Sequence, residues 1–315
     1  MVNQPNTKIN VKVANGPVAN HDAKVVDALD AIKVRIIDAP SIEQLCRYIP
    51  EYVSATWADT PIENVPDIND IDTRRWMVNE VLHGRTFLPT AAETIGITMC
   101  IEGISIQDVT HLTRYRRGSF SAQSTGDRFM TDETYTMPAN IKGSMFEERY
   151  KKLMTLSQNL YIDMVNSGIS PLDARYVTPV ARSTFYYARF AYSDVLALIR
   201  QRIDRNIQPM SDNVLAYKMY EELLKIYPSI YDVINIDAAP KFYLSTMNTE
   251  YCSNLYRPEE MHTKDMDNVP GPENFVYGYR EWPESFKKAY DSVKLAQAKA
   301  KDLLTVKHSD QLVNA

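Results

Sequence analysis

The chain has 315 residues, a length that fits one large domain with extensions or two smaller domains. Hydrophobic residues make up 44% and charged residues 24%, which is ordinary for a globular protein and argues against a chain that is disordered throughout. The formal net charge of −5 does not favour DNA or RNA as a partner, so any site for an anion must be local.

The chain begins with a polar segment. Residues 1–35 are rich in Asn, Ala and Val and are expected to form an N-terminal extension. Prolines, asparagines and aspartates predict a loop at Pro61–Asp72. A helix is expected to follow and to end at Gly84, because apolar residues recur at helical spacing at Trp76, Val78, Val81 and Leu82.

A strand and two helices are expected next. Ala92–Ile101 is rich in Ile, Thr and Met and predicts a buried strand. Ser105, with Asp108 three residues later, predicts a capping box that opens a helix, and this helix is expected to run into the arginines that begin at Arg114. Apolar residues at 3.6-residue spacing predict a long amphipathic helix over Ser144–Asn166.

The second half mixes strands and helices. Thr184–Tyr192 is aromatic-rich and predicts a strand, after which Ser193 and Asp194 are expected to cap a helix. A further helix is expected over Ser211–Ile226 and a Lys-rich helix over Glu284–Leu304. Because the strands and helices do not alternate regularly, the predicted fold class is α+β, with a mixed sheet and long helices.

Several classes of protein and site are not expected. The longest apolar stretches are far shorter than the roughly 20 residues that cross a bilayer, and the N-terminus lacks the apolar core of a secretion signal, so we expect a cytoplasmic protein with no membrane partner. No common nucleotide-loop, metalloprotease or serine-hydrolase motif is present. The isolated histidines His83, His111 and His262 are expected to be structural. The scattered cysteines are expected to be reduced thiols that bind no metal: Cys46, Cys100 and Cys252.

Positive charge is concentrated at Arg114, Arg116 and Arg117, which are followed by Gly118 and several hydroxyl residues. Guanidinium groups bind phosphate through paired N–H donors, and hydroxyls with a flexible glycine backbone can complete such a site. The alternative is a basic helix end that interacts with the helix dipole and is otherwise solvated. This segment alone leaves both interpretations open.

The same segment resembles the signature of the flavin-dependent thymidylate synthases, in which Arg-His-Arg is followed by a small residue, Ser, and a Ser-x-Arg-Tyr ending. The corresponding residues here are Arg114-Tyr115-Arg116, Gly118-Ser119, Ser124 and Arg128-Phe129. Other segments also look like those of the family and occur in the family's order: Thr90–Glu93 and Ile101–Ser105 upstream, and Ala174–Pro179 and Arg202 downstream. The resemblance divides the chain into the extension 1–35, a thymidylate synthase-like catalytic domain at 36–236 and a C-terminal extension at 237–315.

Members of this family are homotetramers that bind FAD, deoxyuridylate and methylenetetrahydrofolate and use NADPH as reductant. They are methyltransferases that move a one-carbon unit to C5 of the uracil and reduce it with a flavin hydride, without a cysteine nucleophile. The resemblance therefore implies this fold, these ligands and this reaction for the chain, with no metal.

The resemblance also assigns site residues one by one. Arg202 is the expected catalytic residue, which polarises a carbonyl of the pyrimidine. The implied substrate contacts are His111, Gln123, Ser124, Arg128, Arg175 and Arg202. The implied flavin contacts are Ser54, Thr90, Glu93, Arg114, Tyr115, Arg116, Arg117, Ser121 and Asn206.

Departures from the family pattern gather on the flavin side. Tyr115 replaces the central histidine of the signature, and Ala191 and Ala197 replace asparagines. Asn206 replaces a histidine, and residues 125–127 lengthen the substrate loop. Losing hydrogen-bonding groups near the cofactor should weaken FAD binding or change its redox tuning.

Three functions are consistent with a site that departs from the family pattern mainly at its flavin contacts. The first is a divergent flavin-dependent thymidylate synthase. The second is a pyrimidine deoxynucleotide hydroxymethylase or related C5-modifying enzyme, in which water rather than hydride completes the reaction and the flavin matters less. The third is a non-catalytic nucleotide-binding relative.

Overall fold

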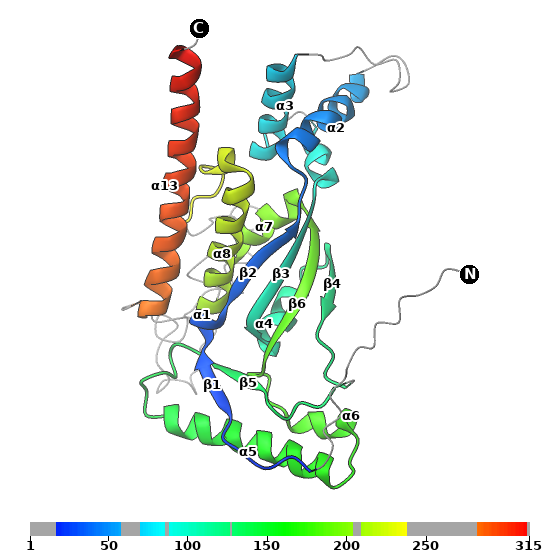
Figure 1. Ribbon diagram of the computed structural model, residues 1–315, viewed down its shortest axis with the longest axis vertical. Coiled ribbons are helices and arrows are strands. Elements are labelled where there is room, and N and C mark those ends of the chain that lie inside the picture. Colours follow the sequence, from blue (N-terminus) through cyan, green and yellow to red (C-terminus); the bar gives the residue numbers. More distant parts are fainter. Residues whose placement is uncertain are drawn as a thin grey trace, which may run out of the picture.

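The protein is an α+β structure, as the mixed pattern of elements predicts. The computed structural model describes residues 17–57, 70–85, 88–126, 128–203, 209–237 and 282–313 (Figure 1). A four-stranded sheet in the order β2-β3-β6-β4 forms the centre, and β1 pairs with β5 in a separate two-stranded sheet. Cys252, His262 and Asn206 lie outside the described residues.

The main sheet is antiparallel throughout its described strands. It is built from β2 (Lys33–Asp38), β3 (Gly96–Ser105), β6 (Ser183–Ala191) and β4 (Gly118–Ala122). Along β6 buried and exposed residues alternate, so that one face of the sheet is covered and the other is open. The covered face carries Thr184, Tyr186, Ala188 and Phe190, and the open face Phe185, Tyr187 and Arg189.

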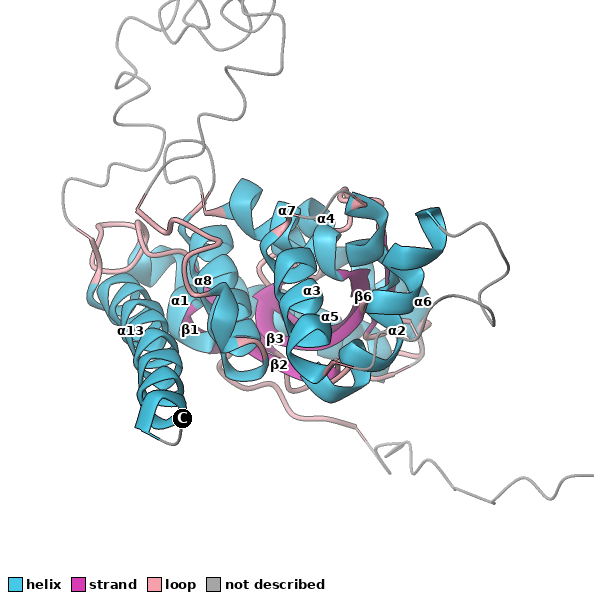
Figure 2. Ribbon diagram, turned by 90° about the horizontal axis from the view of Figure 1, so that it is seen from above, coloured by secondary structure: helices cyan, strands magenta, loops and turns pink. Residues whose placement is uncertain are grey.

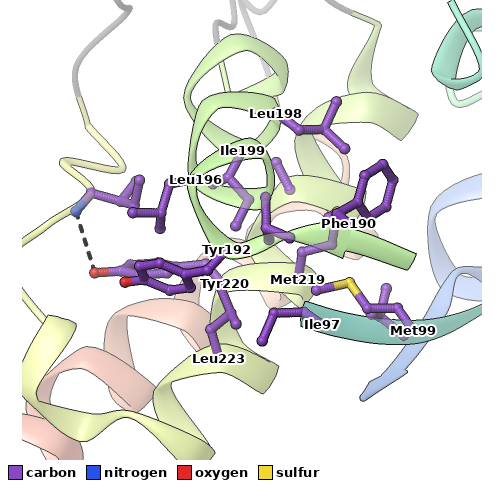
Figure 3. Packing of buried hydrophobic residues seen from close by; sticks show 14 of the residues in the cluster. Ile97, Met99, Phe190, Tyr192, Leu196, Leu198, Ile199, Met219, Tyr220 and Leu223 are labelled. Atoms are coloured by element: carbon purple, nitrogen blue, oxygen red, sulfur yellow. Dashed lines mark hydrogen bonds between the residues drawn. The ribbon is translucent and has the colours of Figure 1, made fainter. Parts of the chain in front are cut away.

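The covered face packs against helices from the second half of the chain. Figure 3 shows Ile97, Met99 and Phe190 of the sheet together with apolar side chains of α7 (Tyr192–Arg202) and α8 (Met210–Ile226). The terminal helix α13 (Glu284–Val313) lies beside α8, farther from the sheet (Figure 2). Burial of these side chains supplies most of the driving force for folding.

The remaining described elements lie around the ends of the sheet. The helix α5 (Glu147–Asn166) crosses below it, close to the small sheet of β1 (Lys24–Asp27) and β5 (Thr134–Met137) (Figure 1). The other α-helices are α1 (Ala28–Ala31), α2 (Ile42–Ser54), α3 (Ile71–His83), α4 (Ile106–Leu112) and α6 (Pro171–Ala174). Four short 3-10 turns are described, η1 (Ala55–Trp57), η3 (Pro89–Thr94), η4 (Arg175–Val177) and η5 (Pro228–Ile230).

Both ends of the described chain pack onto the central domain. Leu29 and Ile32 from the N-terminal side belong to the same buried cluster as Phe286 and Val293 of α13. The boundary between 35 and 36 falls within β2. The division into 1–35, 36–236 and 237–315 stays a prediction.

Local signals located several elements correctly. The helix α3 ends where Gly84 adopts a left-handed conformation with φ of 68°. The capping box that opens α4 is present, because Asp108 N donates to Ser105 Oγ (3.0 Å) and Ser105 N donates to Asp108 Oδ2 (2.8 Å). The strand at β6 and the helices α5, α8 and α13 are also confirmed.

Three expectations about element boundaries were wrong. The predicted cap at Ser193 and Asp194 is not formed, because α7 already begins at Tyr192 and Asp194 lies in its first turn. The strand expected from Ala92 starts only at Gly96, after the turn η3. The helix α4 ends at Leu112, so it does not reach the arginines.

We expect Gly103→Ala to lower the free energy of unfolding by about 3 kcal/mol. Gly103 has φ of 75°, and a Cβ there would lie 1.9 Å from the carbonyl oxygen of Ala31, so both backbone strain and a steric clash oppose the substitution. Urea denaturation followed by circular dichroism measures the loss.

The control is Gly84→Ala. Gly84 has a similar φ of 68° but no atom within 4 Å of a Cβ, so only strain, about 1 kcal/mol, is expected. Equal losses in the two variants would contradict the close approach of β3 to α1.

Candidate functional site

Three clusters contain the predicted site residues that the structure brings together. The first joins the end of α7, the start of α8 and the end of α4 through Arg202, Asp212 and His111. Arg202 Nη1 lies 3.0 Å from Asp212 Oδ2, and His111 Nδ1 lies 2.8 Å from the same oxygen. Arg202 Nη2 donates to the backbone oxygen of His111 at 3.2 Å.

This first cluster is mostly buried. The side chains of Arg202 and Asp212 are 5% and 1% exposed, whereas that of His111 is 34% exposed. Two buried opposite charges stabilise each other only when they are in contact, since each alone would lose its hydration without compensation. His111 is therefore the part of the cluster that a ligand could reach, and the expectation that it stands alone was wrong.

A buried tyrosine lies next to the first cluster. Burial, followed by the nearby charge of Asp212, raises the pKa of Tyr186 well above the usual value for a tyrosine. Its hydroxyl has no hydrogen-bond partner among the described residues. Tyr186 also packs against Phe120, with ring centroids 6.0 Å apart, which connects the cluster to β4.

The second cluster contains the predicted phosphate contacts. Arg175 Nη1 donates to Thr125 Oγ1 at 3.1 Å, so this arginine reaches the loop that carries Ser124. Within the loop, Gly126 N donates to Ser124 Oγ at 3.3 Å. Gln123 accepts a bond from the Thr184 hydroxyl (3.4 Å), which attaches the start of the loop to β6.

Arg128 in this loop is anchored by a carboxylate that the sequence did not point to. Its Nη2 lies 2.7 Å from Glu133 Oε1, and Glu133 Oε2 also accepts a bond from Arg182 Nη1 at 3.0 Å. The side chains of Glu133 and Arg182 are only 6% and 1% exposed. Neither residue lies in a recognisable motif, so no sequence signal would have identified them.

The third cluster lies at the junction of η3, β4 and β6. Here a cavity of about 440 Å³ is lined by residues that include Glu93, Arg117 and Arg189. Tyr115 donates to Asp194 Oδ1 at 3.1 Å, and Arg117 Nη1 lies 3.4 Å from the same oxygen. Burial and then the charge of Asp194 raise the pKa of Tyr115 to about 12.

The composition of this cavity suits an anionic ligand. Arg117 and Arg189 supply guanidinium groups, and Thr94 and Ser119 supply hydroxyls. A Cβ on Gly96 would lie 2.3 Å from Arg189 Nη2, so the absence of a side chain at Gly96 leaves room for this guanidinium.

Other predicted flavin contacts do not gather in the cavity. Ser54 is at the end of α2, and Thr90 is in η3 near Glu93, but neither lines the cavity. Arg114, Arg116 and Ser121 are exposed. Within the ranges that the structure describes, Arg114 and Arg116 have no ion pair with a carboxylate.

Neither a metal-binding cluster nor a membrane-spanning helix is found in the described part of the chain. No three His, Cys, Asp or Glu side chains there lie close enough together to hold a metal ion. Among the same residues, no helix has the length and apolar character needed to cross a membrane.

Comparison with known proteins gives consistent matches. Residues 44–229 match the model of the thymidylate synthase complementing protein family. A flavin-dependent thymidylate synthase of Pyrococcus furiosus is 26% identical over 174 residues, which cover 54% of this chain and 70% of that protein. One from Saccharolobus solfataricus is 26% identical over 170 residues, covering 52% of this chain and 62% of that protein.

A solved structure supports the fold. The UMP/dUMP methylase PolB from Streptomyces cacaoi, bound with 5-Br UMP, aligns with a TM-score of 0.50 at 16% identity and covers 65% of this chain and 93% of that chain. At this identity the likeness concerns the arrangement of the elements alone.

We expect Asp212→Asn to lower the free energy of unfolding by about 3 kcal/mol, because it leaves the buried guanidinium of Arg202 without its counter-charge. The matched control is Asp38→Asn. Asp38 pairs with Arg189 at the same 3.0 Å, but both side chains are more than half exposed, so the expected loss is below about 1 kcal/mol. Chemical denaturation measures both, and similar losses would show that the buried pair contributes no more than the exposed one.

Proposed function

This chain belongs to the thymidylate synthase complementing protein family, and we propose that it is a flavin-dependent thymidylate synthase, a one-carbon transferase that methylates C5 of deoxyuridylate. The observation that carries the proposal is the extent of the family match. All three clusters lie inside residues 44–229, from Glu93 to Asp212. The relatives described above are thymidylate synthases or a UMP/dUMP methylase, so a hydroxymethylase or a non-catalytic binding protein is not favoured.

The second cluster is the proposed site for the nucleotide phosphate. Arg128 and Arg175 offer guanidinium donors, and Ser124 and Gln123 lie on the loop that Arg175 contacts. A phosphate monoester carries close to two negative charges at neutral pH and accepts several hydrogen bonds, which this donor set can supply. Local arginines thus provide anion affinity in a chain whose net charge is −5.

The first cluster is the proposed site for the pyrimidine. Asp212 offsets the charge of Arg202, so the pair presents polarised N–H donors more than a free positive charge. Donors that are held rigidly in a dry environment stabilise the charge that develops on a carbonyl oxygen as C5 attacks its electrophile. His111, the exposed member, would face the nucleotide beside Arg202.

The cavity of the third cluster is the proposed site for FAD. Arg117 and Arg189 fit a pyrophosphate, so the charges of the cavity agree with this cofactor. When bound, FAD supplies the hydride that reduces the transferred carbon. Ala191 offers no side-chain hydrogen bond in this cavity, which supports weaker flavin binding. Methylenetetrahydrofolate and NADPH are the proposed co-substrates.

We further infer that the working form is a homotetramer in the cytoplasm, with active sites shared between subunits. The cavity is open to solvent, and Phe185 and Tyr187 on the uncovered face of the sheet are 39% and 42% exposed. On α5 an apolar stripe, Leu153, Leu156 and Leu160, is 55%, 65% and 45% exposed. Apolar stripes of this kind support contact with another chain.

The purified protein is expected to show flavin absorbance after incubation with FAD and to release tritium from C5-labelled deoxyuridylate when methylenetetrahydrofolate and NADPH are present. Release should require NADPH, because the reduced flavin completes the reaction. Release without NADPH and without flavin, together with a hydroxymethyl product, would contradict the proposal.

In the same assay Arg202→Lys serves as the site variant. Lysine keeps the positive charge beside Asp212 but lacks the second nitrogen, Nη2, that donates to the backbone oxygen of His111. We therefore expect the rate to fall by about 100-fold while the fold is retained. Circular dichroism checks the fold. An unchanged rate would remove Arg202 from the mechanism.

Light scattering of the wild-type protein is expected to give four times the chain mass of 36.1 kDa. Leu156→Glu introduces a charge into the exposed stripe of α5 and should lower the measured mass. The control is Leu303→Glu on α13, where the leucine is 56% exposed, and it should leave the mass unchanged. A monomeric wild type, or a Leu156→Glu variant of unaltered mass, would contradict this interface.

A further inference from the structure

We propose that Glu133 and Arg182 are positioning residues for the nucleotide phosphate, holding Arg128 in the orientation that binds it. The inference rests on the proposed function, since deoxyuridylate is the ligand that it assumes. Neither residue belongs to the motifs that pointed to the site. Their role follows from burial, charge and unsatisfied hydrogen-bond donors in the second cluster.

The geometry places one carboxylate between two arginines. Arg128 Nη2 lies 2.7 Å from Glu133 Oε1 and 2.8 Å from Oε2, so this nitrogen spans both oxygens. Arg182 Nη1 donates to Oε2 from the other side at 3.0 Å. Arg128 is 30% exposed, whereas Glu133 and Arg182 are 6% and 1% exposed, so Arg128 alone of the three is within ready reach of a ligand.

The buried members are attached to rigid elements. Glu133 immediately precedes β5, and Arg182 immediately precedes β6, where it forms a bridge with Tyr135 of β5. Arg182 N donates to Pro179 O, and its own carbonyl accepts a bond from Ile106 N, both at 3.0 Å. Arg128, by contrast, lies in a loop. Tying a loop arginine to a fixed carboxylate lowers the conformational entropy that phosphate binding would otherwise have to overcome.

The charges of the second cluster match the proposed ligand. Glu133 offsets one of its two arginines, and Arg175, which bonds Thr125 of the loop, has no carboxylate partner among the described residues. Three guanidinium groups and one carboxylate leave two positive charges, close to the charge of a phosphate monoester. Without Arg182, the charge of the buried carboxylate would cancel that of Arg128, and only the positive charge of Arg175 would remain.

Two buried donors of the cluster lack acceptors. Arg128 Nε and Arg182 Nη2 have no hydrogen-bond partner among the residues that the structure describes. Buried guanidinium donors are costly to leave unpaired, so an acceptor at this cluster would be favourable. A phosphate bound at Arg128, the member within reach of a ligand, would supply acceptor oxygens on that side of the cluster.

The decisive experiment removes the buried carboxylate and its buried partner together. The double variant Glu133→Gln, Arg182→Gln keeps the net charge of the cluster, so a change in affinity cannot come from net charge. Calorimetry is expected to show deoxyuridylate binding weakened about tenfold, with binding of the unphosphorylated deoxyuridine unchanged. In steady-state assays KM for deoxyuridylate should rise by a similar factor while kcat stays within about twofold.

A simple competition model predicts the opposite result. If Glu133 only competed with phosphate for Arg128, removing it would leave affinity unchanged or strengthen it. Affinity for deoxyuridylate equal to or higher than that of the wild type therefore overturns the proposal. Equal weakening for deoxyuridylate and deoxyuridine also overturns it, because the effect would then not depend on the phosphate.

The matched control is the double variant Arg35→Gln, Glu102→Gln. This pair lies at 3.1 Å across β2 and β3, is 61% and 39% exposed, and also conserves net charge, so deoxyuridylate binding should not change. If the buried double variant fails to fold, Glu133→Asp replaces it. Aspartate keeps the charge but draws the carboxylate back by one methylene, and the same selective loss for the phosphorylated ligand is expected.

Failure of the proposed function gives a different outcome from failure of this inference. If the wild type binds inorganic phosphate but not deoxyuridylate, the proposed substrate is wrong, and the same variants titrated with phosphate decide the positioning role. If the wild type binds neither probe, both proposals fail.

Discussion

The ion pair between Arg202 and Asp212 is the interaction on which the arrangement of the site depends. Both side chains are almost completely buried, so neither charge can be moved to solvent without rearranging the elements that carry them. Arg202 is the last residue of α7, and Asp212 lies in the first turn of α8. The pair therefore ties the end of α7 to the start of α8.

Neighbouring polar groups extend this constraint. Asn213 Nδ2 donates to the backbone oxygen of Arg202 at 2.8 Å, and Ser211 donates to Asp108 Oδ1 of α4 at 2.8 Å. With His111 at the end of α4, three helix termini converge on one buried carboxylate. Such a network leaves few alternative arrangements, which is what a preorganised donor site requires.

A shared design relates the three clusters. In each cluster one arginine contacts a carboxylate of the protein. The pairs are Arg202 with Asp212, Arg128 with Glu133, and Arg117 with Asp194. The carboxylates reduce the local positive charge but determine where each guanidinium points. An acidic chain can in this way offer anion sites without a basic surface, and affinity then depends on geometry more than on net charge.

Elements encoded by neighbouring residues could be predicted from the sequence, whereas contacts between distant residues could not. The capping box at Ser105, the glycine that ends α3 and the aromatic-rich strand β6 all follow from short-range patterns, as does the order of the family motifs. The carboxylate of Asp194, expected to cap α7, lies inside its first turn and accepts bonds from Tyr115 and Arg117, 79 and 77 residues away. Likewise, Glu133 contacts Arg182 across 49 residues of sequence, and His111 contacts Arg202 across 91 residues.

By itself the sequence determined the α+β class and the arginines available for anion binding. Only the tertiary structure decided which carboxylate holds each arginine, because ion pairing depends on distance in space and on the exclusion of water, and neither is written in the spacing of residues along the chain.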